Sequence, residues 1–416
     1  MRLQRIRLLA LAVVVCTAAC SSGGRTAADD HSSAAIRAAV DGKRPEFVNA
    51  DGPRGRKAWD DTRQLYEQNG YRLEWSDGKR PGRELDGLIR ALKAADTEGL
   101  DPSAYRLDEL KPTADLSELD LRATYAYLRY ARDLEAGDAD LVDALQTALA
   151  DHNVERSLRG LAPAAPQYHG LKQKLAEARA HGDAGAVQQI AMNMDRWRAL
   201  PADLGRRYVM VNIPAFHLDV VEDGKSVLGM KVVTGKKNSP TPVLADEMTS
   251  VVFSPSWHIP QDIVQKEILP KLDTDPGYLD RNNMVADEDG HYRQLPGKGN
   301  SLGGVKFLFP NHYNVYLHDT PSQKLFDRIE RDFSHGCVRL DEPEALAAYV
   351  LRDRPEWTHE KIAAAMQSGV EQSVKLTAPL PIYLVYFTAW EENGALKTVP
   401  DVYGLDGKED AKAVKP

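Results

Sequence analysis

The sequence has very little sulfur. Its 416 residues include three cysteines, and two of these, Cys16 and Cys20, lie within the first twenty residues. The third, Cys337, stands far from both, in the run FSHGCVRL. Once the first nineteen residues are removed, Cys337 has no partner but Cys20 for a disulfide, and a free thiol at this place needs a chemical reason.

Long apolar runs are scarce as well. The run Leu8–Ala19 is too short to span a bilayer as a mature helix. It follows arginines at positions 2, 5 and 7 and ends in small residues, which is typical of an export signal. The sequence TAAC ending at Cys20 resembles a bacterial lipobox, so we expect Cys20 to be lipidated, with ordinary cleavage after Ala19 as the alternative.

The sequence also lacks an excess of positive charge. The formal net charge is -8, and it becomes -11 after the signal is removed, because three arginines and no acid are lost. This balance argues against a nucleic-acid partner.

Export has a further consequence for Cys337, because structural cysteines normally pair in an oxidising compartment. We therefore expect Cys337 to be kept as a thiol for its chemistry.

The length predicts two or three domains, and the residue patterns predict an α+β fold. Apolar residues recur every three or four positions in the first half, while β-rich runs begin near Arg207. The predicted segments are a signal peptide with lipobox (1–20), a flexible linker (21–44), a helical domain (45–165), a helical connector (166–204), a β-rich domain (205–392) and a C-terminal tail (393–416). A long insertion with few strand signals, 258–304, interrupts the β-rich domain.

A catalytic cysteine needs a base, because the thiolate is the nucleophile. His335 lies two residues before Cys337, so on an extended strand both side chains would share a face. His318 ends another β run, NVYLHD, and an adjacent strand would bring it close to the thiol. Gly336 lets a substrate carbonyl approach the backbone, and its amide and that of Cys337 are candidate oxyanion donors.

The motifs HDT and SHGCVR resemble the signature of L,D-transpeptidases with a YkuD-type catalytic domain. The runs VKFLFPNHYNVYLHDTPS and PIYLVYFTAW resemble the large YcbB-like subgroup, and YRLEWSDG resembles its N-terminal scaffold domain. The resemblance covers most of residues 60 to 405. One departure is that the segment Ala164 to Ala191 is too short for the peptidoglycan-binding module common in that subgroup, so this module is expected to be absent.

The resemblance implies roles for individual residues. Cys337 would be the nucleophile, His318 the base, and the backbone carbonyl of Asp319 the group that orients His318. Gly336 and Cys337 would supply the oxyanion hole, with His335 nearby. The cleft and substrate residues would be Arg339, Tyr316, Asn314 and Trp257, and the insertion 258–304 would be a capping subdomain.

The resemblance also implies a reaction and its setting. The enzyme would join peptidoglycan stem peptides by 3→3 cross-links through a cysteine thioester, using a donor tetrapeptide and the amine of an acceptor meso-diaminopimelate. No cofactor and no metal would be needed.

The protein would lie in the periplasmic cell envelope, held to a membrane through the lipid on Cys20. The outer membrane is favoured, because Ser21 replaces the aspartate that commonly retains lipoproteins at the inner membrane. The sequence does not determine an oligomeric state.

Three alternatives stay open at this level. His318, His335 and Cys337 could bind zinc, although no HExxH or CxxC motif supports such a site. Water could replace the acceptor amine, which would make the protein an L,D-carboxypeptidase, or another amine could be exchanged at the same thioester. A non-catalytic lipoprotein that tethers peptidoglycan would not need the thiol at all.

Overall fold

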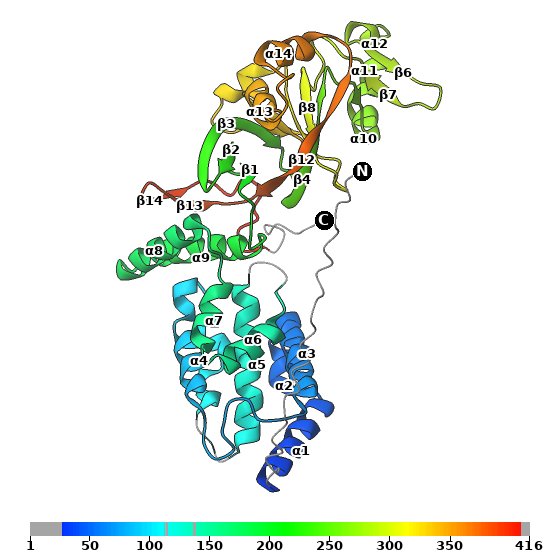
Figure 1. The fold of residues 1–416 in the computed structure, drawn as a ribbon. Coiled ribbons are helices and arrows are strands. Elements are labelled where there is room, and N and C mark those ends of the chain that lie inside the picture. Colours follow the sequence, from blue (N-terminus) through cyan, green and yellow to red (C-terminus); the bar gives the residue numbers. More distant parts are fainter. Residues whose placement is uncertain (1–26, 112, 114, 136–138, 409–416) are drawn as a thin grey trace, which may run out of the picture.

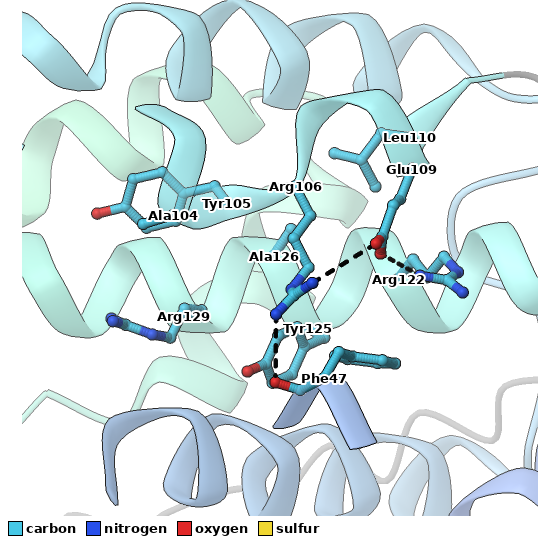
Figure 2. Close-up of a pocket in the computed structure, with 10 residues that line it drawn as sticks. All are labelled: Phe47, Ala104, Tyr105, Arg106, Glu109, Leu110, Arg122, Tyr125, Ala126 and Arg129. Carbon is cyan, nitrogen blue, oxygen red and sulfur yellow. Dashed lines mark hydrogen bonds and ion pairs between the residues drawn. The ribbon is translucent and has the colours of Figure 1, made fainter. Parts of the chain in front are cut away.

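The computed structural model describes residues 27–111, 113, 115–135 and 139–408, and it confirms the predicted α+β fold. Helices form the N-terminal half and strands dominate the C-terminal half (Figure 1). Within these described ranges, no helix has both the length and the apolar character needed to cross a bilayer. The predicted signal peptide and Cys20 lie outside the described residues.

The helical half packs around α5 (Leu116–Leu134). Asp115 caps this helix by accepting hydrogen bonds from the amides of Ser117 and Glu118. Tyr127 and Leu128 are fully buried in the core that its neighbours share. Those neighbours are α2 (Glu46–Ala50), α3 (Gly52–Asn69), α4 (Arg83–Lys93), the 3₁₀ turns η1 (Ala95–Glu98), η2 (Pro102–Tyr105) and η3 (Leu107–Leu110), α6 (Leu141–Ala150) and α7 (Val154–Leu161).

The linker predicted for residues 21–44 is wrong for most of its length. Residues Ala27–Asp41 form the helix α1, which packs against α3 and α5. Ile36 and Val40 lie one turn apart and are buried in the helical core. Two large apolar residues at this spacing are enough to dock a helix of small residues, although the composition alone resembles a tether.

The strands of the second half form a closed circuit. The sheet order is β10-β3-β11-β9-β8-β4-β12-β1-β2, and β2 also pairs with β3, which closes the strands from β3 to β2 into a ring with β10 attached to β3. The pairs β1–β12, β9–β11 and β3–β10 are parallel, and the other pairs are antiparallel. The strands are β1 (Arg207–Asn212), β2 (His217–Glu222), β3 (Lys225–Gly235), β4 (Leu244–Phe253), β8 (Val305–Leu308), β9 (Leu317–His318), β10 (Asp332–Ser334), β11 (Val338–Leu340) and β12 (Gln372–Val385).

Two pairs of helices cover the sheet. α13 (Pro343–Val350) and α14 (His359–Gln367) bury Leu346 and Ile362 in one core with the strands. α8 (Pro166–Ala180) and α9 (Ala184–Arg198), predicted as a connector, share a second core with Tyr208 and Phe387. They also contact the helical half, where the Tyr168 hydroxyl donates to Glu98 at 2.8 Å. The short 3₁₀ turn η5 (Gln323–Asp327) precedes β10.

The insertion 258–304 folds as a small unit at one end of the β-rich domain (Figure 1). Its own apolar cluster includes Ile259, Val264 and Met284. A three-stranded sheet ties it to the main fold, since β5 begins at Trp257, the last residue before the insertion. The elements are β5 (Trp257–His258), α10 (Gln261–Ile263), the π-helical turn η4 (Val264–Ile268), α11 (Leu269–Leu272), α12 (Tyr278–Arg281), β6 (Met284–Ala286) and β7 (Tyr292–Gln294).

The tail predicted for residues 393–416 is wrong as far as residue 408. β13 (Ala389–Glu392) pairs with β14 (Ala395–Thr398) in a hairpin. Beyond the hairpin, Tyr403 is buried in the core of the β-rich domain and stacks on Tyr386, with ring centroids 5.6 Å apart. The composition of this segment is mostly polar, so composition alone did not predict that Tyr403 packs in the core.

Candidate active site

The nucleophile candidate Cys337 lies in a turn between two strands. β10 ends at Ser334 and β11 begins at Val338. Gly336 has φ +112°, a backbone conformation that residues with a side chain rarely adopt. Their spacing predicted that His335 and Cys337 share one extended strand. The structure instead places both residues in the turn between β10 and β11. Cys337 is a half-buried free thiol, and its sulfur donates to the backbone oxygen of Asn314 at 3.9 Å.

Hydrogen bonds inside the turn change the role expected for Gly336. The Gly336 amide donates to the Ser334 hydroxyl oxygen at 3.1 Å, and the same hydroxyl donates to the Cys337 carbonyl at 2.5 Å. The amide of Gly336 is thus occupied and is not a free oxyanion donor, which corrects the expectation from sequence. Gly336 contributes the sharp turn instead.

His318 is placed beside the cysteine turn by parallel pairing of β9 and β11. In this register Leu317 is opposite Val338, and His318 is opposite Arg339. The Nδ1 atom of His318 lies 2.5 Å from the backbone oxygen of Asp319. A carbonyl oxygen accepts only, so Nδ1 carries the proton and Nε2 is left as the basic nitrogen. The contact expected for the Asp319 carbonyl is present in the structure.

Cations stand on both sides of His318 across the sheet. Lys306 of β8 is opposite His318 on one side, and Arg339 of β11 is opposite it on the other. Burial, followed by the charge of Arg339, lowers the pKa of His318 to about 3. Burial raises the pKa of Cys337 to about 11. The two groups are therefore both neutral at pH 7, and the Nε2 atom of His318 carries no proton.

Cys337 and His318 open into a cavity of about 750 Å³ that the insertion covers. The cavity is lined by all four residues expected at the cleft, which are Trp257, Asn314, Tyr316 and Arg339. The Tyr316 ring contacts the His318 ring edge to face, with centroids 5.8 Å apart. Within the described chain, the buried Nε of Arg339 has no hydrogen-bond partner.

His335 faces the insertion. Its Nε2 lies 2.7 Å from Glu267 Oε1 of η4, and the Lys236 ammonium is 3.0 Å from the same nitrogen. Glu267, Asp262 and Lys271 of the insertion line the cavity together with His335. The insertion is thereby tied to the cysteine motif itself, next to the thiol.

The zinc alternative lacks a ligand cluster in the part of the chain that the structure describes, where no group of three His, Cys, Asp or Glu side chains is arranged to hold a metal ion. His335 pairs with Glu267, and the Nδ1 atom of His318 is taken by a carbonyl. The geometry thus favours acid–base chemistry at the thiol over metal ligation.

Sequence reasoning missed several residues around the site. Ser334, Lys306 and Glu267 contact or flank the three motif residues, yet none stands in a pattern with a chemical meaning of its own. Ser334 could have been noticed, because it begins the SHGC run. Lys306 and Glu267 become visible only once strand register and the fold of the insertion are known.

Two family models match this chain. Residues 206–360 match the YkuD model, described as an L,D-transpeptidase catalytic domain, and residues 60–175 match the Scaffold domain. The β-rich half is therefore a YkuD-type L,D-transpeptidase catalytic domain, and the helical half is a Scaffold domain, as the motifs suggested.

The chain is also similar to individual known proteins. The chain is 33% identical over 243 residues to a putative L,D-transpeptidase of Haemophilus influenzae, covering 54% of this chain and 49% of that protein. The chain thus matches about half the length of this curated relative. An L,D-transpeptidase from Mycobacterium smegmatis aligns at 17% identity and TM-score 0.25, over 43% of this chain and 58% of that one. L,D-transpeptidase 3 from Mycobacterium tuberculosis aligns at 16% identity and TM-score 0.23, over 43% and 60%.

Proposed function

We propose that the chain is an L,D-transpeptidase that cross-links peptidoglycan stem peptides in the cell envelope. The observation that carries this proposal is that Cys337 and a neutral, carbonyl-oriented His318 line the same covered cavity of a YkuD-type domain. In this proposal Cys337 is the nucleophile, His318 the base, and the Asp319 carbonyl the orienting group.

The first half of the reaction forms a thioester. The sulfur of Cys337 attacks the carbonyl carbon of the third stem residue, meso-diaminopimelate, while the thiol proton moves to His318 Nε2. The bond to the terminal D-alanine then breaks, and the leaving amine takes the proton from His318. Between attack and bond breaking, the substrate carbonyl oxygen becomes an oxyanion. The backbone amide of Cys337 would donate a hydrogen bond to it.

The second half resolves the thioester. The side-chain amine of an acceptor meso-diaminopimelate gives a proton to His318 and attacks the thioester carbon. A 3→3 amide bond forms, the carbon–sulfur bond breaks, and the sulfur regains the proton. Water in place of the amine would give carboxypeptidation, and another amine would give exchange, so exclusion of water by the covering insertion would decide the outcome.

The remaining parts of the proposal concern substrate contacts and location. Arg339, with Tyr316, Asn314 and Trp257 around it, would hold a stem carboxylate or the peptide chain. A lipid on Cys20 would keep the protein at a membrane, with the outer membrane favoured. The similarity to a cell-wall enzyme family supports the cell envelope as its location. The Scaffold domain would place the catalytic domain relative to that anchor.

A carbapenem tests the proposal, because a strained β-lactam acylates an activated nucleophile. The full chain should gain the mass of one carbapenem, and peptide mapping should place it on Cys337. Cys337→Ser should remove the adduct, and a disaccharide tetrapeptide should yield 3→3 dimers by mass spectrometry only with the parent chain. Equal labelling of parent and variant, or dimer formation by the variant, would show that Cys337 is not the nucleophile.

A further inference from the structure

The loop behind the cysteine turn is held by a residue from the C-terminal segment. Residues 235–241 connect the end of β3 to the region before β4, and Tyr403 reaches both ends of this loop. The Tyr403 hydroxyl donates to the Gly235 carbonyl at 2.5 Å and accepts from the Thr241 amide at 3.3 Å. The loop is tight, since a Cβ on Gly235 would lie 2.2 Å from the Ser239 carbonyl oxygen.

Thr241 connects this loop to the nucleophile turn. Its hydroxyl accepts from the Gly235 amide at 2.9 Å and donates to the Gly336 carbonyl at 2.8 Å. Thr241 is 2% exposed and Tyr403 is 7% exposed, so both hydrogen bonds lie in a dry environment where they hold their geometry well. A chain of contacts therefore runs from Tyr403 through Thr241 to Gly336.

Fixing the Gly336 carbonyl also fixes the Cys337 amide. The two groups belong to one planar peptide unit, and in a trans peptide the N–H points opposite to the C=O. With the carbonyl directed back to Thr241, the N–H of Cys337 is directed away from the core behind the turn. Since the Gly336 amide is taken by Ser334, the Cys337 amide is the remaining one of the two amides expected to donate to an oxyanion next to the sulfur.

We propose that Tyr403 and Thr241 are positioning residues that aim the Cys337 amide at the carbonyl oxygen of the acylating substrate. Tyr403 acts through the 235–241 loop, and Thr241 acts directly on the Gly336 carbonyl. Tyr403 lies outside residues 206–360, which match the catalytic-domain model, so this chain completes its site with its own C-terminal segment. The Tyr403 amide is itself fixed by the Tyr386 hydroxyl at 2.7 Å.

Two reactions of the same thiol test this proposal, which rests on the proposed acylation of Cys337. Acylation by a carbapenem passes through an oxyanion, whereas alkylation by iodoacetamide does not. Tyr403→Phe and Thr241→Val should slow single-turnover acylation about 10- to 100-fold, because misdirecting or losing one oxyanion donor has effects of this order. Alkylation should stay within about twofold, because the thiol and His318 are unchanged.

Two variants serve as controls. Thr241→Ser keeps the hydroxyl and should restore most of the acylation rate. Tyr383→Phe removes a phenol that donates to the Leu204 carbonyl at 3.2 Å, on the side of the sheet covered by α8 and α9, and should leave both reactions unchanged. Tyr403→Phe keeps the stacked ring, so it carries the test by itself if Thr241→Val does not fold.

The outcomes separate this proposal from the proposed function. If the parent chain is not acylated, the transpeptidase proposal fails. If the parent is acylated and Tyr403→Phe reacts at the same rate, the positioning proposal alone is overturned. A parallel loss of acylation and alkylation also overturns it, because that result would mean a general loosening of the site and no selective effect on the oxyanion donor.

Discussion

The neutral resting state of His318 depends on three neighbours rather than on one partner. The Asp319 carbonyl fixes the tautomer, and the cations Lys306 and Arg339 disfavour a second proton from either side of the sheet. Burial acts in the same direction. A cysteine protease-like ion pair would need the opposite environment, with a negative group beside the imidazole. This site instead keeps both partners neutral until substrate arrives.

The resting protonation state predicts the pH dependence of thiol reactivity. Because burial raises the pKa of Cys337 to about 11, the thiolate fraction should rise about tenfold per pH unit from pH 7 to pH 9. The rate of alkylation by iodoacetamide, followed by intact-protein mass, should rise in proportion without a plateau. A plateau near neutral pH would instead reveal a preformed thiolate–imidazolium pair.

His318 itself should matter for acylation far more than for folding. His318→Ala removes the base that takes the thiol proton, so carbapenem acylation at pH 7 should slow by about 100-fold or more. The second-order acylation rate measures this effect, and circular dichroism checks that the strands persist. An acylation rate equal to that of the parent would remove His318 from the mechanism.

At the scale of elements, the insertion 258–304 is joined to the chemistry by the contact between Glu267 and His335. Both side chains are about one-third exposed or more, so the pair contributes only about 0–1 kcal/mol to global stability. Its effect is local, because it links η4 of the insertion to the residue two positions before the nucleophile. Weak contacts of this kind suit a cover that must open for substrate.

Glu267→Gln should therefore loosen the cover without unfolding the domain. We expect the ratio of hydrolysis to transpeptidation to rise by about twofold to tenfold, because water gains access to the thioester, while Tm shifts by no more than about 3 °C. Tripeptide and 3→3 dimer products, separated by mass, give the ratio. Asp262→Asn is the matched control, since Asp262 lines the same cavity but pairs at 3.7 Å with Lys266 of its own segment. Equal ratios in the parent and Glu267→Gln would mean that this contact does not hold the cover.

At the scale of the whole molecule, chemistry was easier to predict from the sequence than domain limits were. Cys337 and His318 stand in a motif with a chemical meaning, and both lie in the cavity. The ends of the domains depend instead on packing between distant segments. Ile36 docks a helix of small residues, and Tyr403 returns a polar segment to the core. The residues that bury Ile36 and Tyr403 lie far away in the sequence, so the local sequence around either residue does not predict its burial.

The helices α8 and α9 were predicted as a connector, but packing between distant segments assigns them to the β-rich domain. Their apolar faces share a core with the sheet, where Trp197 stacks on Phe387 with centroids 4.8 Å apart. Their contacts to the preceding helices are polar by comparison, with Lys172 and Tyr168 of α8, which lie at the end of the Scaffold match, both bound to Glu98. Polar groups released from an interface are solvated at little cost, whereas exposed apolar groups are not. The two helices therefore belong energetically to the catalytic domain.

Two truncated chains that differ only in residues 166–204 test this assignment. A chain starting at residue 166 should be soluble, unfold cooperatively and accept a carbapenem on Cys337. A chain starting at residue 205 exposes the sheet face that carries Tyr208, Tyr383 and Phe387, each worth about 1.5–3 kcal/mol when fully buried. It should aggregate or melt at least about 10 °C lower in a thermal denaturation followed by circular dichroism. Equal melting temperatures for the two chains would instead make α8 and α9 an independent connector, and the catalytic domain would then begin near Arg207.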